Sequence, residues 1–195
     1  MRESRKLTRD FYARPVLLVA RECIGKVLVH RTADGVAAGR IVEVEAYRGP
    51  LDLAAHSSRG RTKRTEVMYG PPGHAYVYLI YGMYECLNLV AEPEGSPGCV
   101  LIRAVEPMVG IDLMNRRRPK ARSAEKLASG PGNLTRAFAI TRTQNGVDVT
   151  RGSLVVRKWR REPTFEIGVT PRIGIRQCAD WPLRFVMAGN GAVSG

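Results

Sequence analysis

Two glutamates and a tyrosine, Glu43, Glu45 and Tyr47, alternate with small apolar residues in the segment IVEVEAY. Strict alternation is typical of a β-strand and places these three side chains on one face. A carboxylate therefore lies beside an aromatic ring, which makes it a candidate for catalysis. A solvated sheet face is the simpler interpretation. Glutamate is nevertheless a poor strand former, and it opposes the attraction of a basic protein for a polyanion, so both interpretations stay open.

Arg103 is a charged residue inside a predicted apolar strand, CVLIRAV, at residues 99–105. An unpaired buried charge is costly, so this guanidinium needs an anionic partner. One of the two carboxylates, Glu43 or Glu45, is the obvious candidate.

Four of the seven tyrosines lie within nine residues of one another, in the segment YVYLIYGMYECLN. Alternation places Tyr76 and Tyr78 on one face of a predicted strand. Gly82 suits a tight hairpin turn, and residues 85–90 are apolar enough to form the returning strand. Tyr81 then lies at the hairpin tip, where an aromatic side chain could wedge between stacked bases. Aromatic cross-strand pairs that stabilise a small sheet are the alternative.

The charge balance indicates a polyanionic partner. Lys and Arg number 31 against 18 Asp and Glu, which gives a net charge of +13. Such a field favours nucleic acid and makes binding depend on salt. We expect no membrane association, because no segment approaches the roughly 18 apolar residues that a spanning helix needs. The amino terminus lacks the apolar region of a secretory signal, so we expect a cytoplasmic protein, associated with the nucleoid if bacterial.

The cysteines and histidines do not indicate a metal site. The four cysteines are dispersed without a C-x-x-C pair, and the three histidines have no zinc-ligand spacing. We expect reduced cysteines in the core and no bound metal.

The chain of 195 residues is short enough for one domain and long enough to bury a core. We expect residues 1–6 to be flexible, and we expect Gly25 to end the first helix and Pro119 the second. The predicted helices cover residues 15–23, 110–118 and 134–140. The predicted strands outside the aromatic hairpin cover residues 26–31, 37–47, 99–105, 153–157, 172–175 and 183–187.

Three basic or glycine-rich stretches are candidates for phosphate contacts. Residues 59–64 carry four cations in a turn-rich loop, and residues 116–126 form the densest positive run. A solvated helix end is the alternative for that run. The glycines at residues 129–133 precede a predicted helix, and a helix amino terminus can hold a phosphate.

Four segments together closely resemble the alkyladenine, or 3-methyladenine, DNA glycosylase family. Their order and spacing also match, and the resemblance runs from about Leu7 to near the carboxy terminus, including PRIGI and PLRF. The segments are RIVEVEAYRGPLDLAAHS (residues 40–57), YVYLIYGMYECLN (76–88), CVLIRAVEP (99–107) and SGPGNLTRAFAI (129–140).

The resemblance implies a base-excision repair enzyme that flips a damaged purine out of double-stranded DNA and hydrolyses its N-glycosidic bond, with no cofactor. By resemblance, Glu45 activates the attacking water, and Arg103 helps to hold that water and the carboxylate. The flipped base is stacked between Tyr47 on one side and His56 with Tyr78 on the other.

The same resemblance implies that Tyr76 lies near the base and that Asn88 discriminates against the amino group of guanine. Tyr81 fills the gap that the extruded nucleotide leaves. Residues 90–98 appear as a slightly longer segment than in animal members, which puts the far end of the hairpin in question. Neither central strand offers a lysine nucleophile, so we expect water to attack.

We therefore predict one α+β domain over residues 1–195, with a curved, mostly antiparallel β-sheet, a protruding DNA-intercalating hairpin and flanking helices. A monomer suffices for a wedge and a pocket. A non-catalytic nucleic-acid-binding β-module is the main alternative, because basic charge and aromatic strands would serve it equally. An enzyme that acts on RNA or nucleotides is another.

Overall fold

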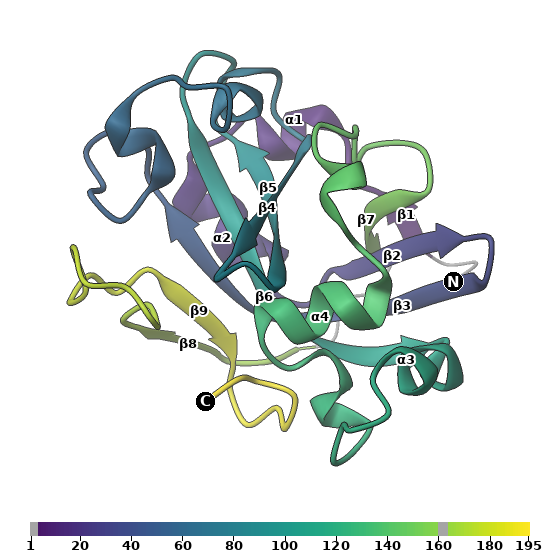
Figure 1. Ribbon diagram of the computed structural model, residues 1–195. Helices are drawn as coiled ribbons and strands as arrows, with labels where there is room; N and C mark the ends of the chain where they lie inside the picture. The colour runs from purple at the N-terminus through teal and green to yellow at the C-terminus, as the bar shows by residue number, and fades with distance from the viewer. Residues whose placement is uncertain (1–3, 160–163) are drawn as a thin grey trace.

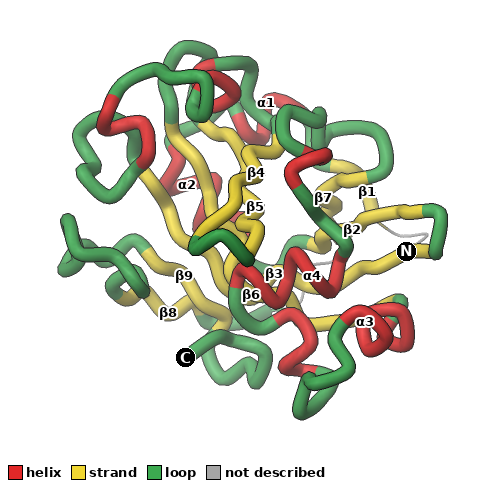
Figure 2. Tube along the Cα trace, in the orientation of Figure 1, coloured by secondary structure: helices red, strands yellow, loops and turns green. Residues whose placement is uncertain are grey.

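Strand β3 (Gly35–Tyr47) is the centre of the sheet (Figures 1 and 2). One of its edges pairs with β6 (Gly98–Val109) along most of its length. Its other edge pairs first with β2 (Val27–Thr32) and then with β9 (Arg184–Met187), which joins opposite Glu43 and Glu45. Strand β3 therefore has three neighbours, and the segment that carries both glutamates is enclosed by strands on both edges.

The computed structural model describes residues 4–159 and 164–195. Within these ranges nine strands form one sheet in the order β1-β7-β2-β3-β6-β5-β4, with β9 beside β3 and β8 beside β9. Every strand pair in this part of the chain is antiparallel. The predicted single α+β domain with a mostly antiparallel sheet is confirmed. The remaining strands are β1 (Ser4–Lys6), β4 (Ala75–Ile80), β5 (Tyr84–Ala91), β7 (Leu154–Trp159) and β8 (Ile167–Thr170).

Short helices pack on the sheet and close its core. Helix α2 (Val16–Cys23) contacts β3 and β6, whereas α4 (Pro131–Phe138) contacts β5 and β6 (Figure 1). Both helices place apolar side chains, at a spacing of three or four residues, into one core cluster with β3. The other α-helices are α1 (Arg9–Tyr12) and α3 (Ile111–Arg117). Among the described residues, no helix has the length and apolar character needed to cross a bilayer.

A β-bulge reshapes β3 where the two glutamates lie. The register between β3 and β6 shifts on both sides of Glu43. Bulges re-aim side chains and are frequent next to active sites. Glu43 and Glu45 are both fully buried. The simpler interpretation from sequence, a solvated sheet face, is therefore wrong, because Arg103 and the backbone at Ile173 and Ser194 contact the two carboxylates on this face.

The aromatic hairpin forms as predicted. Strands β4 and β5 pair in register from Ala75 to Ile80, and residues 81–83 make the connection. Tyr81 and Gly82 both have positive φ, 52° and 69°, which a tight turn requires here. Tyr81 is 78% exposed at the tip. A bulky residue in this backbone region is uncommon, so the turn holds Tyr81 in a strained conformation outside the core.

Three expectations from sequence are wrong. Residues 4–6 are not a flexible start, because they form β1 and pair with β7; residues 1–3 lie outside the described ranges. Residues 172–175 are irregular, and the strand is β8 at Ile167–Thr170; Pro171, which lacks an N–H donor, follows its end. Cys178 is partly exposed, while the other three cysteines are buried and all four are free.

Removing a core side chain should test this packing. Leu28 in β2 is fully buried, whereas Leu18 in α2 is 50% exposed. We expect Leu28→Ala to lower the free energy of unfolding by about 2–5 kcal/mol, because the cavity would not collapse fully. Leu18→Ala, the matched control, should change it by less than about 0.5 kcal/mol. Urea unfolding at equal m-value measures both, and equal losses would contradict the assignment of Leu28 to the core.

Candidate active site

A cavity of about 460 Å³ opens between the β4–β5 hairpin, the loop at His56, the start of α4 and residues 173–175. Of the residues predicted to act in catalysis, base binding or intercalation, all but Glu45 line it. Those that line it are Tyr47, His56, Tyr76, Tyr78, Tyr81, Asn88 and Arg103. The fold thus brings together residues that are far apart in the chain.

Glu45 lies behind the cavity wall and is held by two hydrogen bonds and one ion pair. Its Oε1 accepts from the backbone N–H of Ile173 at 2.8 Å and faces Arg103 Nη1 at 3.2 Å. Its Oε2 accepts from the hydroxyl of Tyr47 at 2.9 Å. Ile173, Arg103 and Tyr47 themselves line the cavity. The carboxylate is therefore one side chain away from any group that enters, and Oε2 keeps the capacity for a second hydrogen bond.

Arg103 contacts both glutamates of β3. The prediction that one carboxylate pairs with Arg103 is therefore confirmed, and the second carboxylate pairs with it as well. Its Nε donates to Glu43 Oε1 at 2.9 Å while Nη1 reaches Glu45. Glu43 Oε1 also accepts from Arg184 Nε in β9 at 2.7 Å. Two buried carboxylates and two arginines therefore balance one another beneath the cavity.

Aromatic rings form the cavity walls. His56 and Tyr78 are T-shaped with ring centroids 4.5 Å apart, and Tyr76 lies 5.3 Å from Tyr78. The hydroxyl of Tyr76 is 2.9 Å from His56 Nδ1. Burial raises the pKa of Tyr76 to about 12, so this hydroxyl is neutral at physiological pH. A flat aromatic ligand would meet ring faces and edges on these surfaces.

Asn88 is held in one orientation by the strands around it. Its Nδ2 donates to the Tyr76 carbonyl at 3.1 Å, and its Oδ1 lies 3.8 Å from Cys99 Sγ. The amide is nearly fully buried but still lines the cavity. A side-chain amide fixed in this way can distinguish donors from acceptors on the edge of a ligand.

Sequence analysis missed Arg172 and Asp52, which form a fully buried ion pair. Arg172 donates two hydrogen bonds to the Asp52 carboxylate, at 2.5 and 2.9 Å, and one to the Ala46 carbonyl at 3.1 Å. Its guanidinium also lies 4.7 Å from the ring centroid of Tyr47. The pair therefore backs one face of Tyr47 and anchors the loop that leads to His56.

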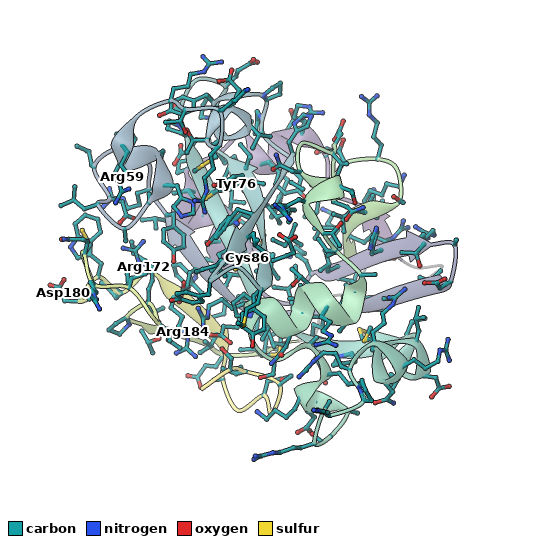
Figure 3. All side chains as sticks on the ribbon, viewed as in Figure 1. Arg59, Tyr76, Cys86, Arg172, Asp180 and Arg184 are labelled. Carbon is teal, nitrogen blue, oxygen red and sulfur yellow. The ribbon has the colours of Figure 1, made fainter. Side chains whose placement is uncertain are left out.

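Arg184 was also missed, although it lies within the predicted apolar strand at residues 183–187, as Arg103 lies within the one at residues 99–105. The argument that a buried arginine needs a carboxylate partner applies equally to it, and that signal would have identified it. In Figure 3, Arg172 and Arg184 are labelled beside the carboxy-terminal strands, and Arg184 is the first residue of β9.

Helix α4 approaches the hairpin closely at its first turn. A Cβ atom on Gly132 would lie 2.7 Å from the ring of Tyr84, so this contact requires glycine. Thr135 Oγ1 donates to the Glu85 carbonyl at 2.9 Å. These contacts fix the exposed tip, with Tyr81 and Met83, against the rim of the cavity.

An arginine lies over one aromatic wall of the cavity. The Arg64 guanidinium lies 5.1 Å from the ring centroid of Tyr78. Arg61 pairs with Glu66 on the exposed surface, so it is partly neutralised. Within residues 4–159 and 164–195, no three His, Cys, Asp or Glu side chains are grouped so that they could hold a metal ion.

The protonation of His56 gives a testable pH dependence. Burial, and then the charges of Arg64 and Arg59, lower its pKa from 6.5 to about 4. The unfolded chain therefore binds more protons than the folded protein between these values, and stability should fall as the pH drops from about 6.5 to about 4. We expect the melting temperature of His56→Gln to fall less than that of the native protein when the pH drops from about 6.5 to about 4. Parallel Tm-versus-pH curves would show that His56 is not buried as a neutral ring.

Known proteins share this sequence over most of its length. The profile of the family described as methylpurine-DNA glycosylase (MPG) matches residues 10–191. A protein of Methanocella arvoryzae is 52% identical over 91% of this chain and 88% of its own. Proteins of Methanoculleus marisnigri and Clostridium acetobutylicum are 50% and 46% identical over at least 96% of this chain and 97% of theirs. All three carry the name "Putative 3-methyladenine DNA glycosylase".

The matched range covers β2 to β9, and thus every residue described above around the cavity. With a family profile across nearly the whole chain and relatives at about half identity, the protein belongs to the methylpurine-DNA glycosylase family.

Proposed function

We propose that this protein is a base-excision repair DNA glycosylase that removes alkylated purines, 3-methyladenine foremost, from duplex DNA and leaves an abasic site. One observation carries the proposal. A buried carboxylate, Glu45, stands directly behind an aromatic-walled cavity, in a chain that belongs to this family. A binding module would gain nothing from a costly buried charge at that place.

In the proposed reaction, Glu45 accepts a proton from a water molecule, and the water oxygen bonds to the anomeric carbon of the deoxyribose. The glycosidic C–N bond breaks, and its electron pair leaves with the base. An alkylated purine carries positive charge, so it departs as a neutral base without prior protonation. The free capacity of Glu45 Oε2 supports this role, since Oε2 accepts one hydrogen bond, from Tyr47, in the described part of the chain. Arg103 would orient the carboxylate and the water.

The aromatic walls would stabilise the extruded base. Flipping costs a few kcal/mol, whereas stacking contributes roughly 1–3 kcal/mol per base, so the two are comparable. We assign Tyr47 to one side of the base, and His56 with Tyr78 to the other, with Tyr76 alongside. A neutral His56 does not repel a cationic purine, which its lowered pKa supports.

Two further residues would select and hold the flipped state. The orientation of Asn88 supports discrimination against the amino group of normal guanine. The exposure of Tyr81 supports its insertion into the base stack, because a ring that is 78% exposed contributes little to folding. The net charge of +13 would attract the DNA backbone.

One chain supplies both the cavity and the hairpin tip with Tyr81, so we propose that the glycosylase acts as a monomer. Its DNA substrate would place this activity in the cytoplasm, or at the nucleoid in a bacterium.

Replacing Glu45 should separate chemistry from binding. We expect Glu45→Gln to slow single-turnover release of 3-methyladenine from duplex DNA by about 10²–10⁴-fold, the usual contribution of a positioned general base. Binding to the same duplex should be nearly unchanged. Glu22→Gln, which alters an exposed ion pair with Arg14, is the matched control. Excision by Glu45→Gln at the native rate would refute the catalytic assignment. Binding without excision by the native protein would leave only a binding module.

The hairpin tip should govern the flipped state rather than the bond cleavage. We expect Tyr81→Ala to weaken binding to a lesion duplex by about 1–3 kcal/mol, or about five- to 150-fold, because one stacking contact is lost. Release from a single-stranded lesion should change little, since no base stack has to be filled. A fluorescent base analogue opposite the lesion reports flipping directly. Unchanged fluorescence and affinity would mean that Tyr81 does not intercalate.

A further inference from the structure

Glu43 is fully buried and does not line the cavity, yet its carboxylate accepts three hydrogen bonds. Its Oε1 accepts from Arg103 Nε at 2.9 Å and from Arg184 Nε at 2.7 Å, and its Oε2 accepts from the backbone N–H of Ser194 at 2.7 Å. These donors come from β6, β9 and the segment after β9. A side chain with no access to a ligand thus ties three parts of the fold together.

Glu43 determines how many N–H groups of Arg103 remain to contact Glu45. A carboxylate facing an arginine commonly takes two parallel N–H donors, the bidentate arrangement. Here Arg103 gives Nε to Glu43, so a single contact, from Nη1 at 3.2 Å, reaches Glu45. Its Nη2 donates to Ser194 Oγ at 3.4 Å. The guanidinium is thereby divided between two carboxylates and held at all three nitrogens.

Charge balance makes this division stable. Burial opposes ionisation of Glu43, but hydrogen bonds from Ser194 and Arg184 outweigh it, and the pKa of Glu43 lies below its ordinary value. Arg184 also donates to the Ser194 carbonyl at 2.8 Å and to Thr170 Oγ1 at 3.1 Å. Glu43 and Arg184 are therefore fixed independently of Glu45, and they present Arg103 in a defined position.

We propose that Glu43 is a positioning residue for base excision. Together with Arg184 and the Ser194 amide, it holds Arg103 so that one guanidinium N–H contacts Glu45 Oε1, and Glu45 Oε2, which accepts from Tyr47, keeps its second acceptor site for water. The inference rests on the proposed glycosylase function. Without Glu43, Arg103 would turn to bind Glu45 with two donors and occupy the oxygen that the water needs.

The first experiment compares Glu43→Gln with the native protein on a 3-methyladenine duplex. We expect single-turnover release to fall on the order of 10–100-fold, as small misplacements of catalytic groups do, with affinity for the duplex within about twofold. Native protein that releases no base would refute the glycosylase function itself. Native activity with an unchanged Glu43→Gln rate would instead overturn this inference alone.

A second variant separates positioning from charge balance. The double variant Glu43→Gln/Arg184→Met removes one buried charge of each sign. Its melting temperature should therefore be higher than that of Glu43→Gln alone. We expect its release rate to stay low, because Arg103 is still not held. Recovery of rate together with melting temperature would mean that Glu43 is merely structural and would overturn the proposal.

If Glu43→Gln does not fold, Ser194 offers a milder test. Ser194→Pro removes the N–H that binds Glu43, whereas Glu22→Gln changes only an exposed ion pair with Arg14 and serves as the control. We expect release to slow in the proline variant and to stay near the native rate in the control. A proline variant that releases base as fast as the control would contradict the proposal.

Discussion

Burial of charge is the constraint on which this structure depends. Transferring a carboxylate or a guanidinium from water into the interior costs several kcal/mol even after relaxation, and only close pairing with good hydrogen bonds offsets that cost. Each buried carboxylate behind the cavity meets at least one arginine. The set, here called the arginine–carboxylate core, comprises Glu43, Glu45, Asp52, Arg103, Arg172 and Arg184.

This core determines where the other elements must lie. Its members come from β3, β6, β9 and the irregular segments at residues 52 and 172, so these five pieces must dock together for any of them to be stable. The register shifts in β3 flank Glu43, and both Glu43 and Glu45 contact the same guanidinium. Polar groups fixed in this way before a ligand arrives need no reorganisation during reaction, which is the basis of electrostatic catalysis.

The hairpin tip differs from the buried core, because its large apolar side chains are exposed. Tyr81, Met83 and Tyr84 are exposed at its tip, where folding gains little from them, and the turn holds Tyr81 at positive φ. Large apolar side chains grouped on a surface usually mark an interaction site. One side of the cavity is therefore rigid and charged beneath its wall, while the other carries an apolar projection that only a partner can bury.

The sequence by itself determined the local elements: the alternation in β3, the hairpin around Gly82, helices α2 and α4, the tyrosine cluster, and a carboxylate partner for Arg103. All but the last depend on residues a few positions apart, and the partner for Arg103 follows from the cost of burying an unpaired charge. Tertiary structure alone decided that Glu43 and Glu45 are buried, that Asp52 pairs with Arg172, that Ser194 binds Glu43, and that residues 4–6 add an edge strand. The physical reason is the separation along the chain between the residues that interact. Alternation shows which side chains share a face, whereas burial and pairing depend on segments that lie 60 to 151 residues away in the chain.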